Sequence, residues 1–192
     1  MKKFTREELQ KLTKNNSGKV NVDLGCGARK REGYIGLDSA SLEGVDIVCN
    51  IEEGLPFEDN SIDEIWSSFM FEHVSNPIFL FQELFRICKN DAIIEFRVPY
   101  YQSISQYKDP THKTIITPET MQYFTNDKWY GSDYGINTNF KMLNVEYEYF
   151  PPFVRVNRIF ITKILIYPFM VFARRFLWNV VHNITIKMQV IK

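Results

Sequence analysis

Polar side chains fall at the carboxyl ends of the strands that the sequence predicts. These side chains are Asp23, Asp38, Asn50 and Ser67. The strands are short apolar runs at about 19–24, 33–38, 45–49 and 62–67. Ligands of open parallel α/β sheets bind outside the carboxyl ends of the strands. The sequence therefore predicts one small-molecule site at that edge.

A Gly-x-Gly turn, Gly25-Cys26-Gly27, follows the first strand. Glycine permits positive φ and close approach of the backbone to a ligand. Only ten residues separate Gly27 from Asp38, whereas a crossover between parallel strands normally needs about a dozen. The first crossover is therefore expected to be a helical turn or little more. A dinucleotide site is the rival enzyme hypothesis, but it needs a third glycine where Lys30 stands and an acid farther along.

The other elements predict an α/β fold with a mostly parallel sheet. Thr5 and Glu8 form a capping box for a helix at 5–14. Apolar residues at helical spacing predict a second helix at 78–89. A buried strand is expected at 92–98. Two alternating segments, 140–150 and 183–191, suit an antiparallel pair at one edge.

Residues 1–192 are interpreted as one domain with two long excursions. Residues 100–138 are irregular and predict a lid or substrate loop, with a helix at 118–124 capped by Thr117. Residues 151–183 are interpreted as a helical insertion before the last strand. Within it, two helices are expected over 154–182, divided at Pro168.

Composition limits the class of protein. The chain has no net charge, so nucleic-acid binding is not expected. Cys26, Cys49 and Cys88 are far apart, which suits buried thiols in a reducing cytosol, and no metal site is predicted. The N-terminus lacks the apolar core of a signal peptide, and the longest uncharged apolar stretch, 164–173, is too short to span a bilayer. A cytoplasmic location is expected.

The basic charge is concentrated at the end of the chain. Residues 1–148 carry 23 acidic and 16 basic side chains, whereas residues 149–192 carry seven basic and no acidic ones. For the apolar segment 154–182, three interpretations stay open. It forms a helical hairpin packed on the sheet, it contacts an anionic membrane at the inner face peripherally, or it makes a homodimer contact.

Taken together, the motifs resemble the class I S-adenosylmethionine-dependent methyltransferases, in particular their small type 11-like branch. The matching runs are Val22 to Gly27, Gly33 to Asp38, Leu55 to Asp63 and Phe71-Glu72-His73-Val74. The resemblance implies a Rossmann-like three-layer sandwich with an antiparallel edge strand, and S-adenosyl-L-methionine as cofactor. The sequence does not identify the methyl acceptor, and small molecules, glycans and lipid-linked compounds all stay open.

The resemblance assigns roles in cofactor binding. The glycine turn would lie against the methionine part, with Ser67 and Ser68 nearby. Asp38 would accept the ribose hydroxyls, and Asn50 with Ile51 would contact the adenine. The cofactor-binding residues expected on this basis are Asp23, Gly25, Cys26, Gly27, Asp38, Asn50, Ile51, Ser67 and Ser68.

Three positions depart from the family pattern. Arg29 replaces a glycine and either contacts the cofactor carboxylate or faces solvent. Asn50 stands where Asp is common, but its carbonyl can still accept from the adenine amino group. Phe69 stands where His is frequent. These departures keep a second hypothesis open, a non-catalytic scaffold with the methyltransferase fold.

Methyl transfer is an in-line displacement at a sulfonium, which needs a base only for some acceptors. The candidate catalytic residues are His73, Asp109 and His112. A histidine beside a cleft can act as a base near neutral pH. The alternative roles are structural: His73 would pack the short helix around it, and His112 would fasten its loop. Glu72 is interpreted as structural.

Overall fold

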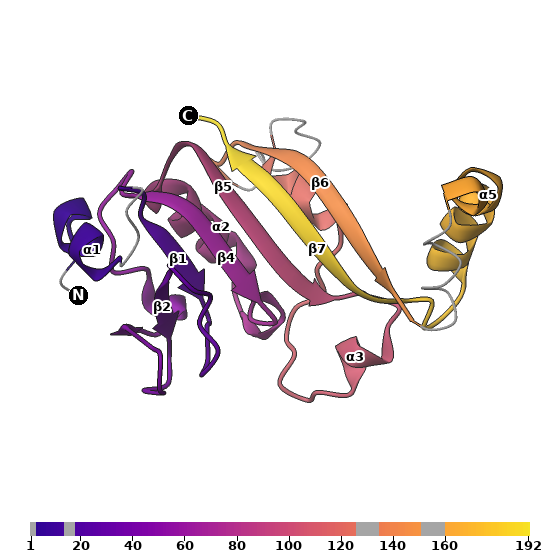
Figure 1. The fold of residues 1–192 in the computed structure, drawn as a ribbon, viewed down its shortest axis with the longest axis horizontal. Coiled ribbons are helices and arrows are strands. Elements are labelled where there is room, and N and C mark those ends of the chain that lie inside the picture. The colour runs from indigo at the N-terminus through magenta and orange to yellow at the C-terminus, as the bar shows by residue number, and fades with distance from the viewer. Residues whose placement is uncertain (1–2, 14–17, 126–134, 151–159) are drawn as a thin grey trace.

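The computed structural model describes residues 3–13, 18–125, 135–150 and 160–192, with the backbone alone for 160–167. One seven-stranded sheet organises these residues, in the order β3-β2-β1-β4-β5-β7-β6 (Figure 1). The strands are β1 (Asn21–Leu24), β2 (Ile35–Asp38), β3 (Ile47–Val48), β4 (Ile62–Ser68), β5 (Cys88–Pro99), β6 (Phe140–Tyr149) and β7 (Val181–Val190).

The first five strands are parallel, and β7 runs antiparallel to both β5 and β6. The mostly parallel Rossmann-like sheet with antiparallel pairing at one edge is thus confirmed. The reversed strand is β7, which lies second from that edge, and β6 forms the edge itself.

The first crossover is a series of turns. No helix occurs in the described stretch 25–34, as its length predicted. The backbone N–H groups of Gly25 and Cys26 both donate to the carbonyl of Leu37, at 2.8 and 3.2 Å. The turn after β1 is therefore fixed directly on β2, and the ends of the two strands lie together.

The described helices are α1 (Arg6–Leu12), η1 (Ile51–Glu53), η2 (Phe71–His73), α2 (Pro77–Ile87), α3 (Ile104–Tyr107), η3 (Thr120–Phe124) and α5 (Phe160–Phe176), where η marks a 3-10 helix. The capping box of α1 is present as predicted. Helix α2 begins at Pro77 because the side chain of Asn76 accepts from Phe79 N. Its apolar side packs on the sheet, where Phe81 contacts the rings of Phe96 and Phe124.

The two faces of the central strands differ in burial. Along β5, Ile94, Phe96 and Val98 are buried on the side covered by α2, whereas Glu95 and Arg97 alternate with them and are only partly buried. Lys187 on β7 pairs with Glu95 at 3.0 Å on that second side. This face of β5 and β7 is therefore polar and only partly buried.

The predicted break at Pro168 is wrong, because α5 continues through it as one helix (Figure 1). A proline removes one backbone hydrogen bond, yet a helix persists where packing compensates. Met170 and Ala173, just beyond Pro168, are buried. Residues 151–159 of the predicted insertion lie outside the described residues. In the described chain, no helix is both long and apolar enough to cross a membrane.

Two other predicted boundaries differ. The turn expected at Asn90-Asp91 is an irregularity inside β5, which starts at Cys88, and Asp91 has φ +64°. The helix expected at 118–124 is the 3-10 helix η3. Thr117 still stabilises its start, since Thr117 Oγ1 accepts from Thr120 N at 3.1 Å.

Candidate active site at the carboxyl edge of the sheet

The turn after β1 requires glycine for two different reasons. Gly25 has φ +72°, and a Cβ there would lie 2.4 Å from Met70 Cγ. Gly27 has φ +54°, but a Cβ there would meet no atom within 4 Å. Gly27 N donates to Asp38 Oδ2 at 2.8 Å, and Ala40 N donates to Asp38 Oδ1 at 2.9 Å. Asp38 thus holds the turn while each of its oxygens retains accepting capacity.

Asp23 and Cys26 are buried side chains next to this turn. Asp23 is 3% exposed, and its Oδ2 accepts from Arg31 N at 2.7 Å. Burial raises the pKa of Asp23, and the hydrogen bond from Arg31 opposes this effect. Burial, with the negative charges of Asp23 and Asp38, raises the pKa of Cys26 to about 11. The Cys26 thiol is therefore protonated at neutral pH. Of the two roles considered for Arg29, its position agrees with the second, since the residue is exposed to solvent.

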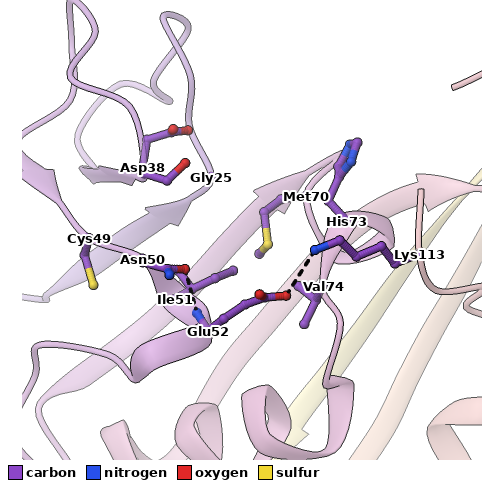
Figure 2. Close-up of a pocket in the computed structure, with 11 residues that line it drawn as sticks. Gly25, Asp38, Cys49, Asn50, Ile51, Glu52, Met70, His73, Val74 and Lys113 are labelled. Carbon is purple, nitrogen blue, oxygen red and sulfur yellow. Dashed lines mark hydrogen bonds and ion pairs between the residues drawn. The ribbon is translucent and has the colours of Figure 1, made fainter. Parts of the chain in front are cut away.

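A first cavity of about 230 Å³ opens beside this turn (Figure 2). Asp38 and Asn50 lie on one side of it, and His73 and Lys113 lie on the other. Glu52 and Lys113 approach to 3.6 Å at its rim. The lining residues are Gly25, Asp38, Ser39, Cys49, Asn50, Ile51, Glu52, Met70, His73, Val74 and Lys113.

Asn50 and Ile51 reach this cavity, but Asn50 is already engaged locally. Its Oδ1 accepts from Glu52 N at 3.1 Å, which caps η1, and its Nδ2 donates to Glu53 Oε1 at 2.8 Å. One lone pair of Oδ1 remains for a ligand.

Ser67 and Ser68 are not among the described residues that line the first cavity. Ser67 is fully buried, and its hydroxyl donates to the carbonyl of Leu24 at 2.7 Å. It joins β4 to β1 instead of facing the cavity. The sequence indicated that both serines lie at a strand end, but it does not determine which way a side chain points.

A second cavity of about 300 Å³ adjoins the first at His73. It contains all three predicted catalytic residues, His73, Asp109 and His112. The loop that carries His112 is fastened to η2, because Lys113 N and Thr114 N donate to the Glu72 carbonyl at 2.8 and 3.0 Å. The lining residues are Phe69, Glu72, His73, Pro99, Ser105, Lys108, Asp109, His112, His182 and Asn183.

Hydrogen bonds orient both histidines in the same way. His112 Nδ1 lies 2.8 Å from the Gln106 carbonyl, which can only accept, so Nδ1 carries the proton and Nε2 has the lone pair. His73 Nδ1 lies 3.0 Å from Thr111 Oγ1 and 3.3 Å from the Thr111 carbonyl. Thr111 Oγ1 donates to Asp109 Oδ1, so it accepts from His73. Both neutral rings therefore present Nε2 as a base.

Glu72 is the functional candidate that sequence reasoning did not select. Its side chain is 1% exposed, and burial raises its pKa to about 7, with the negative charge of Asp109 acting in the same direction. Glu72 Oε1 lies 4.0 Å from His112 Nε2, and Asp109 Oδ2 lies 3.9 Å from the same nitrogen. In the sequence, only the position of Glu72 next to His73 pointed to a functional role. The approach of the 109–114 loop to Glu72 is a long-range contact, which a local pattern does not reveal.

Other lining residues were also missed. Met70 lies against Gly25, and Lys113 reaches the rim of the first cavity. His182 lines the second cavity from the start of β7, where its Nε2 lies 2.6 Å from Ser105 Oγ. No local pattern marks these positions, because they come from distant segments.

Comparison with known proteins relates part of the chain to a family. Residues 22–96 match the family described as a methyltransferase domain. No curated protein matches the chain in sequence. The chain has the class I methyltransferase fold, and its matched segment confirms the resemblance to the S-adenosylmethionine-dependent enzymes of that class.

Solved structures share the fold at low sequence identity. The YcgJ protein of Bacillus subtilis has a TM-score of 0.59 and 14% identity, over 97% of this chain and 98% of its own. A SAM-dependent methyltransferase from Archaeoglobus fulgidus has a TM-score of 0.57 and 18% identity, over 96% and 92%. Phosphoethanolamine N-methyltransferase 2 of Haemonchus contortus, solved with S-adenosyl-L-methionine, has a TM-score of 0.51 and 15% identity, over 97% and 52%.

Proposed function

We propose that this protein transfers a methyl group from S-adenosyl-L-methionine in the first cavity to an acceptor in the second. The observation that carries the proposal is that the two cavities adjoin at His73. One is lined by residues of the methyltransferase motifs and the other by ionisable side chains. The first cavity, about 230 Å³, lies below the roughly 300–1,000 Å³ of typical ligand sites, and the second, about 300 Å³, lies at the lower end of that range. Cofactor and acceptor together would occupy both.

The proposed cofactor contacts follow from the free groups around the first cavity. The Gly25–Gly27 backbone would lie along the methionine part, where no Cβ stands in the way at Gly27. Asp38 would accept the ribose hydroxyls with the lone pairs that Gly27 N and Ala40 N leave free. Asn50 and Ile51 would contact the adenine. The cofactor supplies a methyl group already activated on a sulfonium.

The chain itself has to hold the acceptor in line and remove a proton where the acceptor is a hydroxyl or a carbon acid. His112 suits this role, because the Gln106 carbonyl holds its Nδ1 proton and leaves Nε2 as the base. Asp109 and Glu72, at 3.9 and 4.0 Å from Nε2, would stabilise the imidazolium that forms. His73 lies between the two cavities and would help to position the acceptor.

Binding of S-adenosylhomocysteine tests the proposal by calorimetry. We expect binding by the unaltered chain, and at least about tenfold weaker binding by Asp38→Ala, since a charged hydrogen-bond acceptor contributes about 1.5–3 kcal/mol. The exposed Glu43→Ala serves as a matched control that leaves affinity unchanged. No binding at millimolar ligand would contradict the proposed function, and unchanged affinity of Asp38→Ala would contradict the ribose assignment.

A non-catalytic scaffold is the second candidate. The observation that favours it is the engagement of Asn50, whose oxygen and nitrogen both have partners in η1. A scaffold of this kind would bind S-adenosylhomocysteine weakly or not at all. The same calorimetric titration therefore separates an enzyme from a scaffold that has lost the cofactor site, without knowledge of the acceptor.

The acceptor is proposed to be a small molecule, a glycan or a lipid-linked compound with a proton to lose. The second cavity supports this choice, because it is lined by Asp109, His112 and Lys108 next to the ring of Phe69. Such a lining suits a partly polar acceptor held against one apolar wall.

A further inference from the structure

Three side chains with metal-ligand atoms converge where the two cavities adjoin. Glu72 and His73 come from η2, and His112 comes from the loop after α3. One ligand atom from each lies within 4.8 Å of the others. The backbone bonds from Lys113 and Thr114 to the Glu72 carbonyl fix the loop at this distance. Backbone hydrogen bonds of the fold therefore hold the three side chains close together.

Glu72 needs a partner that the described residues do not provide. Its side chain is 1% exposed, and within the described ranges neither carboxylate oxygen has a hydrogen-bond partner. Burying an unpaired carboxylate costs free energy, so buried carboxylates normally pair with a cation or coordinate a metal. Among the described residues, the basic atom that approaches it is Nε2 of His112, at 4.0 Å, which exceeds a hydrogen bond.

The two histidines are prepared as ligands. A metal-bound histidine usually donates its other ring N–H to a carbonyl or another acceptor, which fixes the ring and its tautomer. His112 Nδ1 does so toward the Gln106 carbonyl at 2.8 Å, and His73 Nδ1 does so toward Thr111 at 3.0 Å. Both Nε2 lone pairs are thereby left for an ion.

We propose that Glu72, His73 and His112 bind a divalent metal ion of the zinc class. Two imidazole nitrogens and one carboxylate oxygen suit such ions, whereas magnesium and calcium prefer oxygen ligands. Bonds of about 2.0–2.2 Å at tetrahedral angles put ligand atoms about 3.4 Å apart, so atoms now within 4.8 Å of one another would approach by up to about 1.4 Å around the ion. His73 is partly exposed and can make this movement.

The remaining coordination position would face the second cavity, which all three ligands line. Asp109 Oδ2, 3.9 Å from His112 Nε2, stands next to that position. If the proposed function holds, the ion would lower the pKa of an acceptor hydroxyl as a Lewis acid. It would do so in place of the base role of His112, because a metal-bound Nε2 has no lone pair left to accept a proton. Metal binding itself does not depend on methyl transfer and is tested separately.

Titration of the metal-free chain with Co²⁺, followed by absorption, and with Zn²⁺, followed by calorimetry, tests the site. We expect one ion per chain, with cobalt bands of a nitrogen and oxygen site and no thiolate charge-transfer band. That band would appear if Cys26, Cys49 or Cys88 bound the ion. Glu72→Gln and His112→Ala should each lower the affinity at least about a hundredfold. His182→Gln is the matched control, a histidine of the same cavity outside the group, and should bind normally.

Thermal unfolding with Zn²⁺ or with a chelator gives a second measurement that does not depend on how well a variant binds cobalt. A ligand that binds the native state raises its stability. Zn²⁺ should therefore raise the melting temperature of the unaltered chain and of His182→Gln, and leave that of Glu72→Gln unchanged. With chelator, Glu72→Gln should melt no lower than the unaltered chain, because it removes a buried unpaired carboxylate.

Two outcomes would overturn the metal site: no ion bound at about millimolar concentration, or equal affinity in the unaltered chain and in both ligand variants. Either result would leave S-adenosylhomocysteine binding as a separate question. Conversely, a chain that binds zinc at this site and fails to bind S-adenosylhomocysteine would retain the metal site and lose the proposed function.

Discussion

At the scale of single residues, the contact between Gly25 and Met70 determines how the first cavity is closed. The turn after β1 approaches the segment after β4 so closely that a single Cβ at Gly25 would overlap Met70 Cγ and Cβ, at 2.4 and 2.6 Å. Gly27, two residues on, has the same sign of φ but open space beside it. Gly25 is therefore needed both for its positive φ and for the close contact with Met70, whereas Gly27 is needed for its positive φ alone.

Alanine substitution at each glycine measures the cost of the backbone conformation separately from the cost of the contact with Met70. Gly27→Ala should cost about 1–2 kcal/mol of stability, the usual cost of a left-handed conformation for a residue with a Cβ. Gly25→Ala should cost more, because Met70 must also move. Urea unfolding measures both changes. Equal losses in the two variants would show that the contact with Met70 contributes nothing.

The sequence predicted the positions of site residues only where these residues lie at, or just after, the ends of strands. Asp38, Asn50 and His73 meet at the first cavity as expected, because parallel strands bring their carboxyl ends to one edge. The orientation of Ser67 and the approach of His112 to Glu72 were not predictable. They depend on side-chain direction and on a loop that returns from about 40 residues along the chain.

At the scale of elements, α2 fastens the 55–59 loop through Arg86, which forms ion pairs with Glu83 and Asp59, and through Glu83 itself. Arg86 Nε donates to Glu83 Oε1 at 2.7 Å, and Arg86 Nη1 donates to Asp59 Oδ1 and to the Phe57 carbonyl at 2.7 and 2.8 Å. Glu83 Oε2 accepts from Leu55 N at 2.8 Å. Hydrogen bonds from Arg86 hold the pKa of Glu83 below its usual value.

A lowered pKa in the folded state makes the contribution of Glu83 depend on pH. It is present above the pKa of the unfolded chain, about 4.3, and is lost as the pH falls through the lower folded value. Glu83→Gln should therefore cost about 1.5 kcal/mol at pH 7, the low end for charged hydrogen bonds because the pair is partly exposed, and progressively less below about pH 4. Chemical unfolding across pH measures this. Glu43→Gln, in an exposed loop, is the control, and a difference that does not shrink in acid would contradict the prediction.

Elements were predictable where local signals agreed. The capping box of α1, the apolar face of α2 and the alternation of β6 and β7 each carry their own pattern. Continuation of α5 through Pro168 was not predictable, because packing outweighs the local cost of the proline. The carbonyls near its end are satisfied from elsewhere: Tyr100 Oη and Gln102 Nε2 donate to those of Arg174 and Arg175 at 3.0 and 3.1 Å.

At the scale of the whole molecule, α5 projects beyond the ends of β6 and β7 (Figure 1). Its described part exposes Phe169, Phe172 and Phe176, at 53%, 53% and 64%. Arg175 is exposed beside them, whereas Arg174 is partly buried over the ring of Tyr147, 4.2 Å from its centroid. An apolar face flanked only by basic charge suits the surface of an anionic membrane, and of the three interpretations of this segment we propose this one.

Co-sedimentation with vesicles checks this proposal. We expect stronger binding to anionic than to neutral vesicles, and Arg175→Gln should weaken anionic binding about fivefold, since one basic residue near such a surface contributes about 1 kcal/mol. Lys141→Gln removes the same charge from an exposed position on β6 and should change little. Equal pelleting with both vesicle types would exclude the membrane contact, and concentration-dependent dimers would favour the homodimer instead.

His73 borders both cavities, and this shared wall has a thermodynamic consequence. A ligand that fixes the His73 ring from one side changes the free energy of binding on the other side. The effect must be reciprocal: if the cofactor alters the affinity of the second cavity by some factor, an occupant of the second cavity alters cofactor affinity by the same factor. One imidazole ring would then couple the occupancy of the two cavities.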